Sequence, residues 1–180
     1  MKKLSLLIAL VIMSTGVFAQ ANAKYYSAGS MIGGAGLNFS AFGLGFGANF
    51  EYGITDMFGI QAAINKNSYE SGIQKWSLIP IDLYATWHNN AFNSGFMSGD
   101  MVDTYAMLGA TWTTYSVDDG SKDESASGVG FGGGIGSRYY FNDHMSLGFE
   151  GKYRFASFEA GGYSLALAWY SIGLNFGYKL

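Results

Sequence analysis

The chain has 180 residues, which is enough for one domain. It contains no cysteine, which excludes a disulfide framework and a thiolate metal site. Charged residues make up only 13% of the chain while aromatic residues reach 17%, whereas a soluble domain carries about 25% charged residues. The formal net charge of −3 gives no basic surface for nucleic acid.

The N-terminus has the features of a secretory signal peptide. Two lysines follow the first methionine, Leu4–Met13 is an apolar stretch too short to span a bilayer, and small residues precede two candidate cleavage points. We favour cleavage after Ala19 because it leaves the shorter region between the apolar stretch and the cleavage point. Cleavage after Ala23 is the alternative. The sequence therefore predicts a signal peptide over residues 1–19 and a mature domain over residues 20–180.

The mature chain alternates between bulky apolar and small or polar residues with the period of a β-strand. The pattern is clearest in Phe42–Ile54 and Tyr170–Leu180, where aromatic and aliphatic residues alternate largely with glycine, serine and asparagine. No later stretch approaches the roughly 18 consecutive apolar residues of a transmembrane helix. With six further segments the pattern predicts eight strands: Ala28–Phe39, Phe58–Asn67, Ile79–His88, Thr104–Tyr115, Gly128–Phe141 and Met145–Phe155.

The connections between these strands alternate in length. Thr55–Met57 and Asn142–His144 read as tight turns, whereas Tyr69–Lys75, Asp118–Ser127 and Glu159–Ser164 read as longer outer loops. Short periplasmic turns and longer outer loops are typical of outer-membrane barrels. Two connections depart from this pattern, a very short first outer loop and a long periplasmic link: Asn38–Ala41 and Asn89–Val102.

Side-chain volume decides which face of the strands points outward. The interior of an eight-stranded barrel is only just wide enough for side chains to fill. The alternate positions of each strand that carry bulky side chains, here called the bulky parity, must therefore face outward, and the positions between them, the opposite parity, face the lumen. So apolar an outer surface is tolerated only in lipid. Aromatic residues near the predicted strand ends suggest two interfacial girdles. The periplasmic girdle would hold Tyr52, Trp87, Phe141 and Tyr178, and the outer girdle Tyr69, Trp76, Tyr115 and Phe158.

Three segments carry a resemblance to a known family. Phe50–Asp56, Ser137–Asp143 and the alternating C-terminus make the chain resemble the bacterial outer-membrane β-barrel domain family, whose members are related in architecture to the OmpA transmembrane domain, OmpX and OmpW. The resemblance implies an all-β, eight-stranded antiparallel up-and-down transmembrane barrel in the outer membrane of a Gram-negative cell. It also implies contact with outer-membrane lipid and lipopolysaccharide, and recognition of the C-terminal strand by the barrel-assembly machinery. We expect a monomer.

Two residues fit this family less well. Members commonly end in phenylalanine as an assembly signal, whereas this chain ends in Leu180. Pro80 lacks the N–H that a closed barrel would use, and we expect a local bulge there, near the outer rim.

The parity that faces the lumen carries charged residues. Taking Asn142–His144 as a three-residue turn places Arg138 opposite Gly148 and diagonal to Glu150, within reach of a long side chain. We therefore expect an Arg138–Glu150 pair assisted by Glu51. The charges could gate a narrow water path or hold a solid barrel in register, and we favour the second. The predicted lumenal cluster is Glu51, Asp82, Arg138, Glu150, Lys152 and Arg154.

No catalytic, cofactor or metal site is predicted. Lipid A modifying barrels need a histidine near the outer leaflet, whereas His88 and His144 fall at expected periplasmic strand ends and read as interfacial or turn residues. Asp118–Glu124 lacks calcium-loop spacing, and no helix follows the glycines of Gly128–Gly134, as a dinucleotide site requires. The sequence predicts a non-enzymatic barrel with a largely filled lumen and a structural or surface-interaction role; the alternative is a narrow channel for small or hydrophobic solutes.

Overall fold

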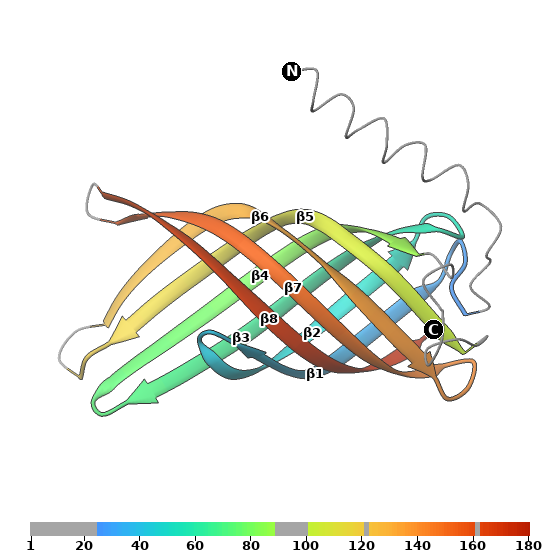
Figure 1. Ribbon diagram of the computed structural model, residues 1–180, viewed down its shortest axis with the longest axis horizontal. Coiled ribbons are helices and arrows are strands. Elements are labelled where there is room, and N and C mark those ends of the chain that lie inside the picture. Colours follow the sequence, from blue (N-terminus) through green and yellow to red (C-terminus); the bar gives the residue numbers. More distant parts are fainter. Residues whose placement is uncertain (1–24, 89–100, 121–122, 161–162) are drawn as a thin grey trace, which may run out of the picture.

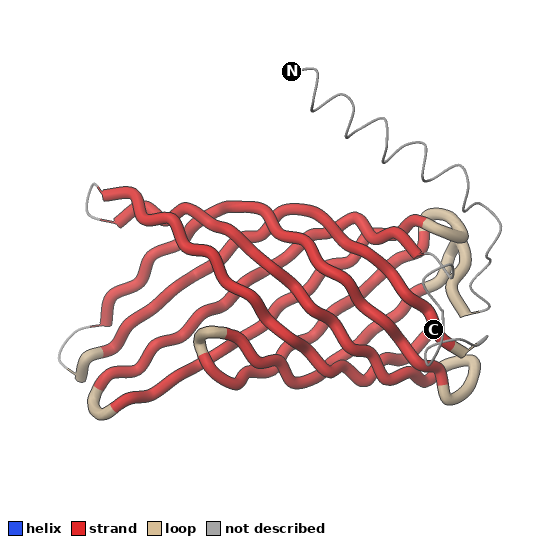
Figure 2. Tube along the Cα trace, viewed as in Figure 1, coloured by secondary structure: helices blue, strands red, loops and turns tan. Residues whose placement is uncertain are grey.

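The computed structural model describes residues 25–88, 101–120, 123–160 and 163–180. Eight antiparallel strands form one closed barrel in which each strand pairs with the next and β8 pairs with β1 (Figures 1 and 2). The strands are β1 Met31–Ser40, β2 Gly43–Gly53, β3 Phe58–Ser71, β4 Gln74–His88, β5 Val102–Asp118, β6 Asp123–Tyr140, β7 Met145–Ala160 and β8 Tyr163–Lys179. The up-and-down barrel expected from the sequence is confirmed.

Some expectations fall outside the described residues, namely the signal peptide, both of its cleavage points and nearly all of the long periplasmic link. Across the ranges that the structure describes, no helix is long and apolar enough to cross a membrane. We call the end that carries the short turns and Leu180 the periplasmic end, and the opposite end the outer end (Figure 1).

The bulky parity points outward on every strand, as side-chain volume predicts. Leu108, Ile135 and Val129 each expose more than 60% of their surface. The opposite parity combines large buried side chains, such as Tyr84, Tyr105 and Tyr140, with glycines that leave them room: a Cβ on Gly136 would lie 2.4 Å from the Tyr105 ring. The barrel thus has an apolar exterior and a tightly occupied interior.

Side chains that follow the strands shape the two tight turns. The Thr55 hydroxyl accepts hydrogen bonds from the backbone N–H groups of Met57 and Phe58, at 3.2 and 2.9 Å. The Asn142 side-chain oxygen does the same for the two residues before and at the start of β7, at 2.9 and 2.8 Å. Such side-chain bonds are why threonine and asparagine favour turns. The second turn sets the expected register, in which Arg138 lies opposite Gly148.

The expected outer loops are wrong, because most of their residues continue the strands. Pairing runs to Ser71–Gln74 in one hairpin, to Asp118–Asp123 in the next and to Ala160–Tyr163 in the last. Polar composition in these segments reflects exposure to water on the outward face rather than loss of strand structure. Hydroxyls on neighbouring strands bond to each other there, as Ser127 does with Thr114 at 3.1 Å.

The strands differ in length, which sets the shape of the outer end. β1 and β2 have 10 and 11 residues, about the length of one tilted membrane crossing. β5 to β8 have 16 to 18 residues, so their outer ends extend beyond a single crossing. The first hairpin accordingly ends far short of the other three (Figure 1).

The bulge expected at Pro80 is also wrong. β3 pairs with β4 at Ile64–Ile81 and again at Asn67–Leu78, so the register is the same on both sides of the interruption. On its other side Pro80 stays in register with Thr113 of β5. The missing N–H therefore interrupts one ladder near the middle of β4 without inserting a residue.

The girdle prediction holds in part. Tyr52, Phe141 and Tyr178 are exposed at the periplasmic end, and Tyr69 is exposed at the outer end, where it stacks on Trp76 with ring centroids 5.6 Å apart. None of the four expected members of the outer girdle lies on the outward parity, since Tyr69 shares the parity of Asn67 and Trp76 that of Leu78, both buried. Phe158 is buried inside the barrel, and Tyr115 packs against the same interior cluster. Both sit on the lumen-facing parity of their strands, which outweighs a preference based on residue type.

Candidate functional site

The periplasmic half of the lumen is organised around Glu51 of β2. Its carboxylate accepts a hydrogen bond from the Thr86 hydroxyl and forms an ion pair with Arg138 of β6. The second carboxylate of this group is Asp103 of β5, whose oxygen lies 3.5 Å from a terminal nitrogen of Arg138. β2 is thereby joined across the interior to the neighbouring strands β5 and β6, on which Asp103 and Arg138 lie directly opposite each other.

His88 lies between these two carboxylates. Its Nε2 is 2.7 Å from Glu51 and its Nδ1 is 2.8 Å from Asp103. A carboxylate only accepts hydrogen bonds, so donation at both contacts requires both ring nitrogens to carry a proton. The ring is also stacked between Tyr26, at a centroid distance of 3.5 Å, and Tyr105, at 5.1 Å, and aromatic faces attract a cation.

Tyr105 connects this group to a second one. The Arg138 guanidinium lies 4.3 Å from the centre of the Tyr105 ring, and the tyrosine hydroxyl donates to Glu150 at 2.6 Å. Glu150 forms an ion pair with Lys152 at 2.7 Å and accepts a hydrogen bond from the Gln61 amide at 3.0 Å. Both residues of this ion pair lie on the lumen-facing parity of β7.

A third group lies further toward the outer end. The Arg154 guanidinium donates to Asp82 three times, with contacts of 2.7 to 3.2 Å, and to the Ser171 hydroxyl at 2.6 Å. The side chains of Arg154 and Asp82 are 1% and 0% exposed. This forked geometry is the strongest arrangement available to an arginine and a carboxylate.

The buried charges balance. Among the described residues, four carboxylates and three permanent cations are buried: Glu51, Asp82, Asp103 and Glu150 against Arg138, Lys152 and Arg154. A doubly protonated His88 makes the sum zero. Buried charges are tolerated when they are paired and hydrogen-bonded. Each residue of this set has a partner of opposite charge, and the Asp103 Oδ2–Arg138 Nη1 contact at 3.5 Å is an ion pair without a hydrogen bond.

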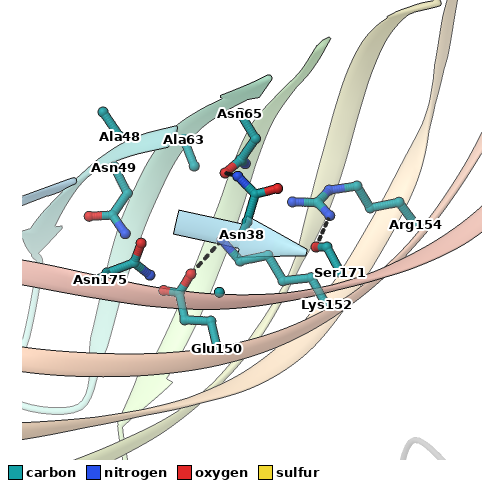
Figure 3. Close-up of a pocket in the computed structure, with 11 residues that line it drawn as sticks. Asn38, Ala48, Asn49, Ala63, Asn65, Glu150, Lys152, Arg154, Ser171 and Asn175 are labelled. Atoms are coloured by element: carbon teal, nitrogen blue, oxygen red, sulfur yellow. Dashed lines mark hydrogen bonds and ion pairs between the residues drawn. The ribbon is translucent and has the colours of Figure 1, made fainter. Parts of the chain in front are cut away.

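Little space remains between the polar side chains. Two small cavities lie in the lumen, each of about 10 Å³, close to the minimum that holds one water molecule. Figure 3 shows the first of them, where the side chains of Asn49 and Asn175 lie near the Glu150–Lys152 pair and Asn38 bonds to Asn65 at 3.3 Å.

Both ends of the lumen are closed by aromatic or apolar side chains. At the periplasmic end, Tyr26 covers His88 and Tyr25 stacks on Tyr140 at 4.7 Å. Lys179 holds these two tyrosines, which precede β1, in place by donating a hydrogen bond of 2.8 Å to the Tyr25 carbonyl. At the outer end the buried cluster consists of Leu78, Ala156, Phe158 and Trp169.

All six residues of the predicted lumenal cluster lie inside the barrel, but the expected pairing differs. Arg138 pairs with Glu51 and Asp103, and Glu150 pairs with Lys152. The expected Arg138–Glu150 ion pair is wrong, whereas the expected contact of Arg138 with Glu51 is present. The partner not expected is Asp103, which lies directly opposite Arg138 on β5. In a closed barrel of this width, a long side chain also reaches residues across the lumen.

Sequence reasoning missed part of this site. The expected interfacial or turn role of His88 is wrong, because its alternation with Trp87 places it on the lumen-facing parity, where it is buried. Asp103 fell just before the predicted start of its strand. Extending that strand by one residue would have put Asp103 on the same face as Tyr105. His144 is the turn residue that was expected, and its ring nitrogen contacts the Lys179 carbonyl at 2.9 Å.

The geometry defines a class of protein, a small transmembrane barrel with an apolar outer band and a lumen filled by paired charges. The family model of the outer membrane protein beta-barrel domain matches residues 5–179. The chain therefore belongs to this family and is a bacterial outer-membrane protein. A comparison with curated protein sequences finds no match.

Several solved barrels have a similar fold. The N-terminal β-barrel domain of Pseudomonas aeruginosa OprF matches with a TM-score of 0.59 and 17% identity, over 85% of this chain and 98% of that one. Neisserial surface protein A gives 0.59 and 16%, over 84% and 95%. Ail, the attachment invasion locus protein of Yersinia pestis, gives 0.54 and 14%, over 85% and 99%. At these identities the likeness shows the fold.

Proposed function

We propose that this protein is a non-enzymatic, non-conducting barrel that serves the outer membrane as a structural element and as a surface for contacts outside the cell. The observation that carries the proposal is the occupied lumen. Three ion-paired groups cross it in succession, and the two cavities between them have volumes of about 10 Å³ each. A path for ions or solutes would require several buried ion pairs to separate together.

The surface role rests on the outer hairpins. β3 to β8 extend beyond one membrane crossing as paired strands and so present a rigid surface, which includes the β3–β4 hairpin. One of the similar structures is described as an attachment invasion locus protein, and we extend contact of that general kind to this chain. The alternative of a narrow channel has less support, since both ends of the lumen are closed as well.

Planar-bilayer recording tests the filled lumen. The refolded protein should give no steady, salt-dependent conductance. The double variant Arg154→Ser/Asp82→Ser removes the outermost ion pair, and we expect it to stay silent too, because the Glu51 and Glu150 groups still fill the lumen below it. Steady conductance of the unmodified protein would overturn the proposal in favour of the channel.

The surface role needs a separate test. In cells that lack the protein, sensitivity to detergent should be relieved by the intact chain and equally by a variant whose outer hairpin is shortened by removing residues 68–77 and closing the strands with a two-residue turn. Adhesion of those cells to a host matrix should be restored by the intact chain alone. Equal adhesion with both chains would show that this hairpin does not take part in contacts outside the cell.

A further inference from the structure

The lumen-facing parity changes character toward the outer end. Nearer the periplasm it carries ion pairs, whereas at the outer end it carries Tyr115 on β5, Phe158 on β7, and Leu165 and Leu167 on β8. With the turn residue Phe42 these side chains line a pocket of about 300 Å³. An apolar cavity of about 150 Å³ already accepts a benzene molecule, and small-molecule pockets begin near 300 Å³.

The pocket has a floor and does not continue into the lumen. Trp169 and Leu78 are 2% and 0% exposed and belong to the cluster that Phe158 completes. Arg154 lies on β7 two residues before Ala156 of that cluster, and its guanidinium is bonded to Asp82 and Ser171. A molecule that enters the pocket therefore binds there and has no open path toward the periplasm.

The barrel wall beside the pocket is shorter on the side formed by the β1–β2 hairpin. β8 pairs with β1 only as far as Ser171–Ser40, although it continues to pair with β7 as far as Tyr163. Leu165 consequently has no strand of the first hairpin opposite it and is 60% exposed, despite lying on the lumen-facing parity. Figure 1 shows this gap in height, with the β1–β2 hairpin ending well before its neighbours.

Residues in and next to its turn hold the β1–β2 hairpin in this position. Gly43 adopts a φ of +86°, which favours glycine, and its carbonyl accepts a hydrogen bond of 3.0 Å from the Asn67 side chain. The Ser40 hydroxyl accepts a bond of 3.1 Å from the Phe42 N–H. The Phe42 ring lies 5.9 Å from Tyr115. The β1–β2 turn is thus an ordered part of the pocket's edge.

The position of this edge identifies the occupant. Because β1 and β2 match one membrane crossing, their turn lies at the outer boundary of the bilayer. Phe39 and Leu44, on the outward face just below it, are 54% and 63% exposed to the hydrocarbon side. An alkyl chain can therefore pass from lipid over Phe42 into the pocket while staying on apolar surface. Glu124 at the rim disfavours an anionic head group entering with the chain.

We propose that this outer pocket binds one alkyl chain of an outer-leaflet lipid, which enters sideways over the β1–β2 turn while its head group stays outside. The pocket's apolar lining would otherwise face water, so occupation removes apolar surface from water. The proposal is independent of conduction, since the pocket ends at a closed floor.

Photo-crosslinking in vesicles tests the site. The probe is a phosphatidylcholine with a diazirine near the end of one chain, mixed into saturated phosphatidylcholine, and the labelled residues are mapped by mass spectrometry. In the unmodified protein we expect labels on Phe158, Leu165 or Leu167, in addition to the lipid-facing band. Leu165→Glu should lower the interior labelling by roughly tenfold, which is the change in affinity that corresponds to burying about one leucine side chain. Labels on the band serve as the internal standard.

Two further variants separate the pocket from general effects. Ala126→Trp fills the pocket and should abolish interior labelling. Ile73→Glu changes an aliphatic residue that is also at the outer end and 77% exposed but does not line the pocket, and it should leave the labelling unchanged. Heat-modifiable mobility on a gel confirms that each variant is folded. Interior labelling absent from the unmodified protein, or equal in all folded variants, would overturn the proposal, as would labelling by a photoreactive free alkane but not by the lipid.

Discussion

The Arg154–Asp82 pair offers the sharpest test of how the lumen is held together. Its contacts join β7 to β4 across the interior, and neither side chain is solvent-exposed beyond 1%. Asp82→Leu leaves a buried guanidinium without its carboxylate, and Arg154→Met leaves a buried carboxylate without its cation. Each single variant should lose about 3–5 kcal/mol of unfolding free energy, the usual cost of removing one partner from a buried pair.

The double variant should lose less than either single one. With both charges gone, two apolar side chains fill the space, and such replacements are often close to neutral. The coupling free energy, the difference between the summed single losses and the double loss, should reach about 3 kcal/mol or more. Urea unfolding from lipid vesicles measures all four free energies by linear extrapolation.

A matched cycle supplies the control. Arg154 and Glu51 share none of the described hydrogen bonds or ion pairs, so Arg154→Met and Glu51→Gln should add to within about 0.5 kcal/mol. Additive losses for Arg154 and Asp82 as well would show that the pair does not hold the barrel, and the argument from buried charge would fail.

Two further predictions concern packing and membrane exposure. Gly136→Val should destabilise the barrel by about 1–3 kcal/mol, because its side chain would collide with the Tyr105 ring; Gly151→Ala, where a Cβ meets nothing within 4 Å, should change the unfolding free energy little, and equal losses would refute the role of the close contact. Leu108→Arg, on the outward face of β5, should cost about 2–4 kcal/mol if it lies near the bilayer midplane, against about 0–1 for Ile73→Arg at the outer tip; equal costs in vesicle unfolding would contradict the assigned membrane position.

Local sequence determined the strands and their outward faces. Alternation assigns each residue to one face, and interior volume leaves only one choice for the bulky face, so Leu44–Ile54 could be oriented without a structure, whereas Phe42 lies in the turn and packs inward. Turn chemistry at Asn142 set the β6–β7 register for a similar reason, since the side chain bonds only to its own backbone neighbours. Residue type is a weaker guide than parity: Phe158 is an aromatic residue near a strand end, but its parity places it inside the barrel.

Tertiary structure decided what lies inside. Pairing across the lumen depends on barrel width and strand tilt, neither of which adjacent-strand register contains, so Glu51 became the main partner of Arg138 while Glu150 paired with Lys152. His88 gained its role only when β2 and β5 brought a carboxylate to each ring nitrogen. The outer pocket likewise exists because the first hairpin is shorter than its neighbours in the closed barrel. Sequence alternation specifies the face of each side chain, but only closure of the barrel determines which side chains meet.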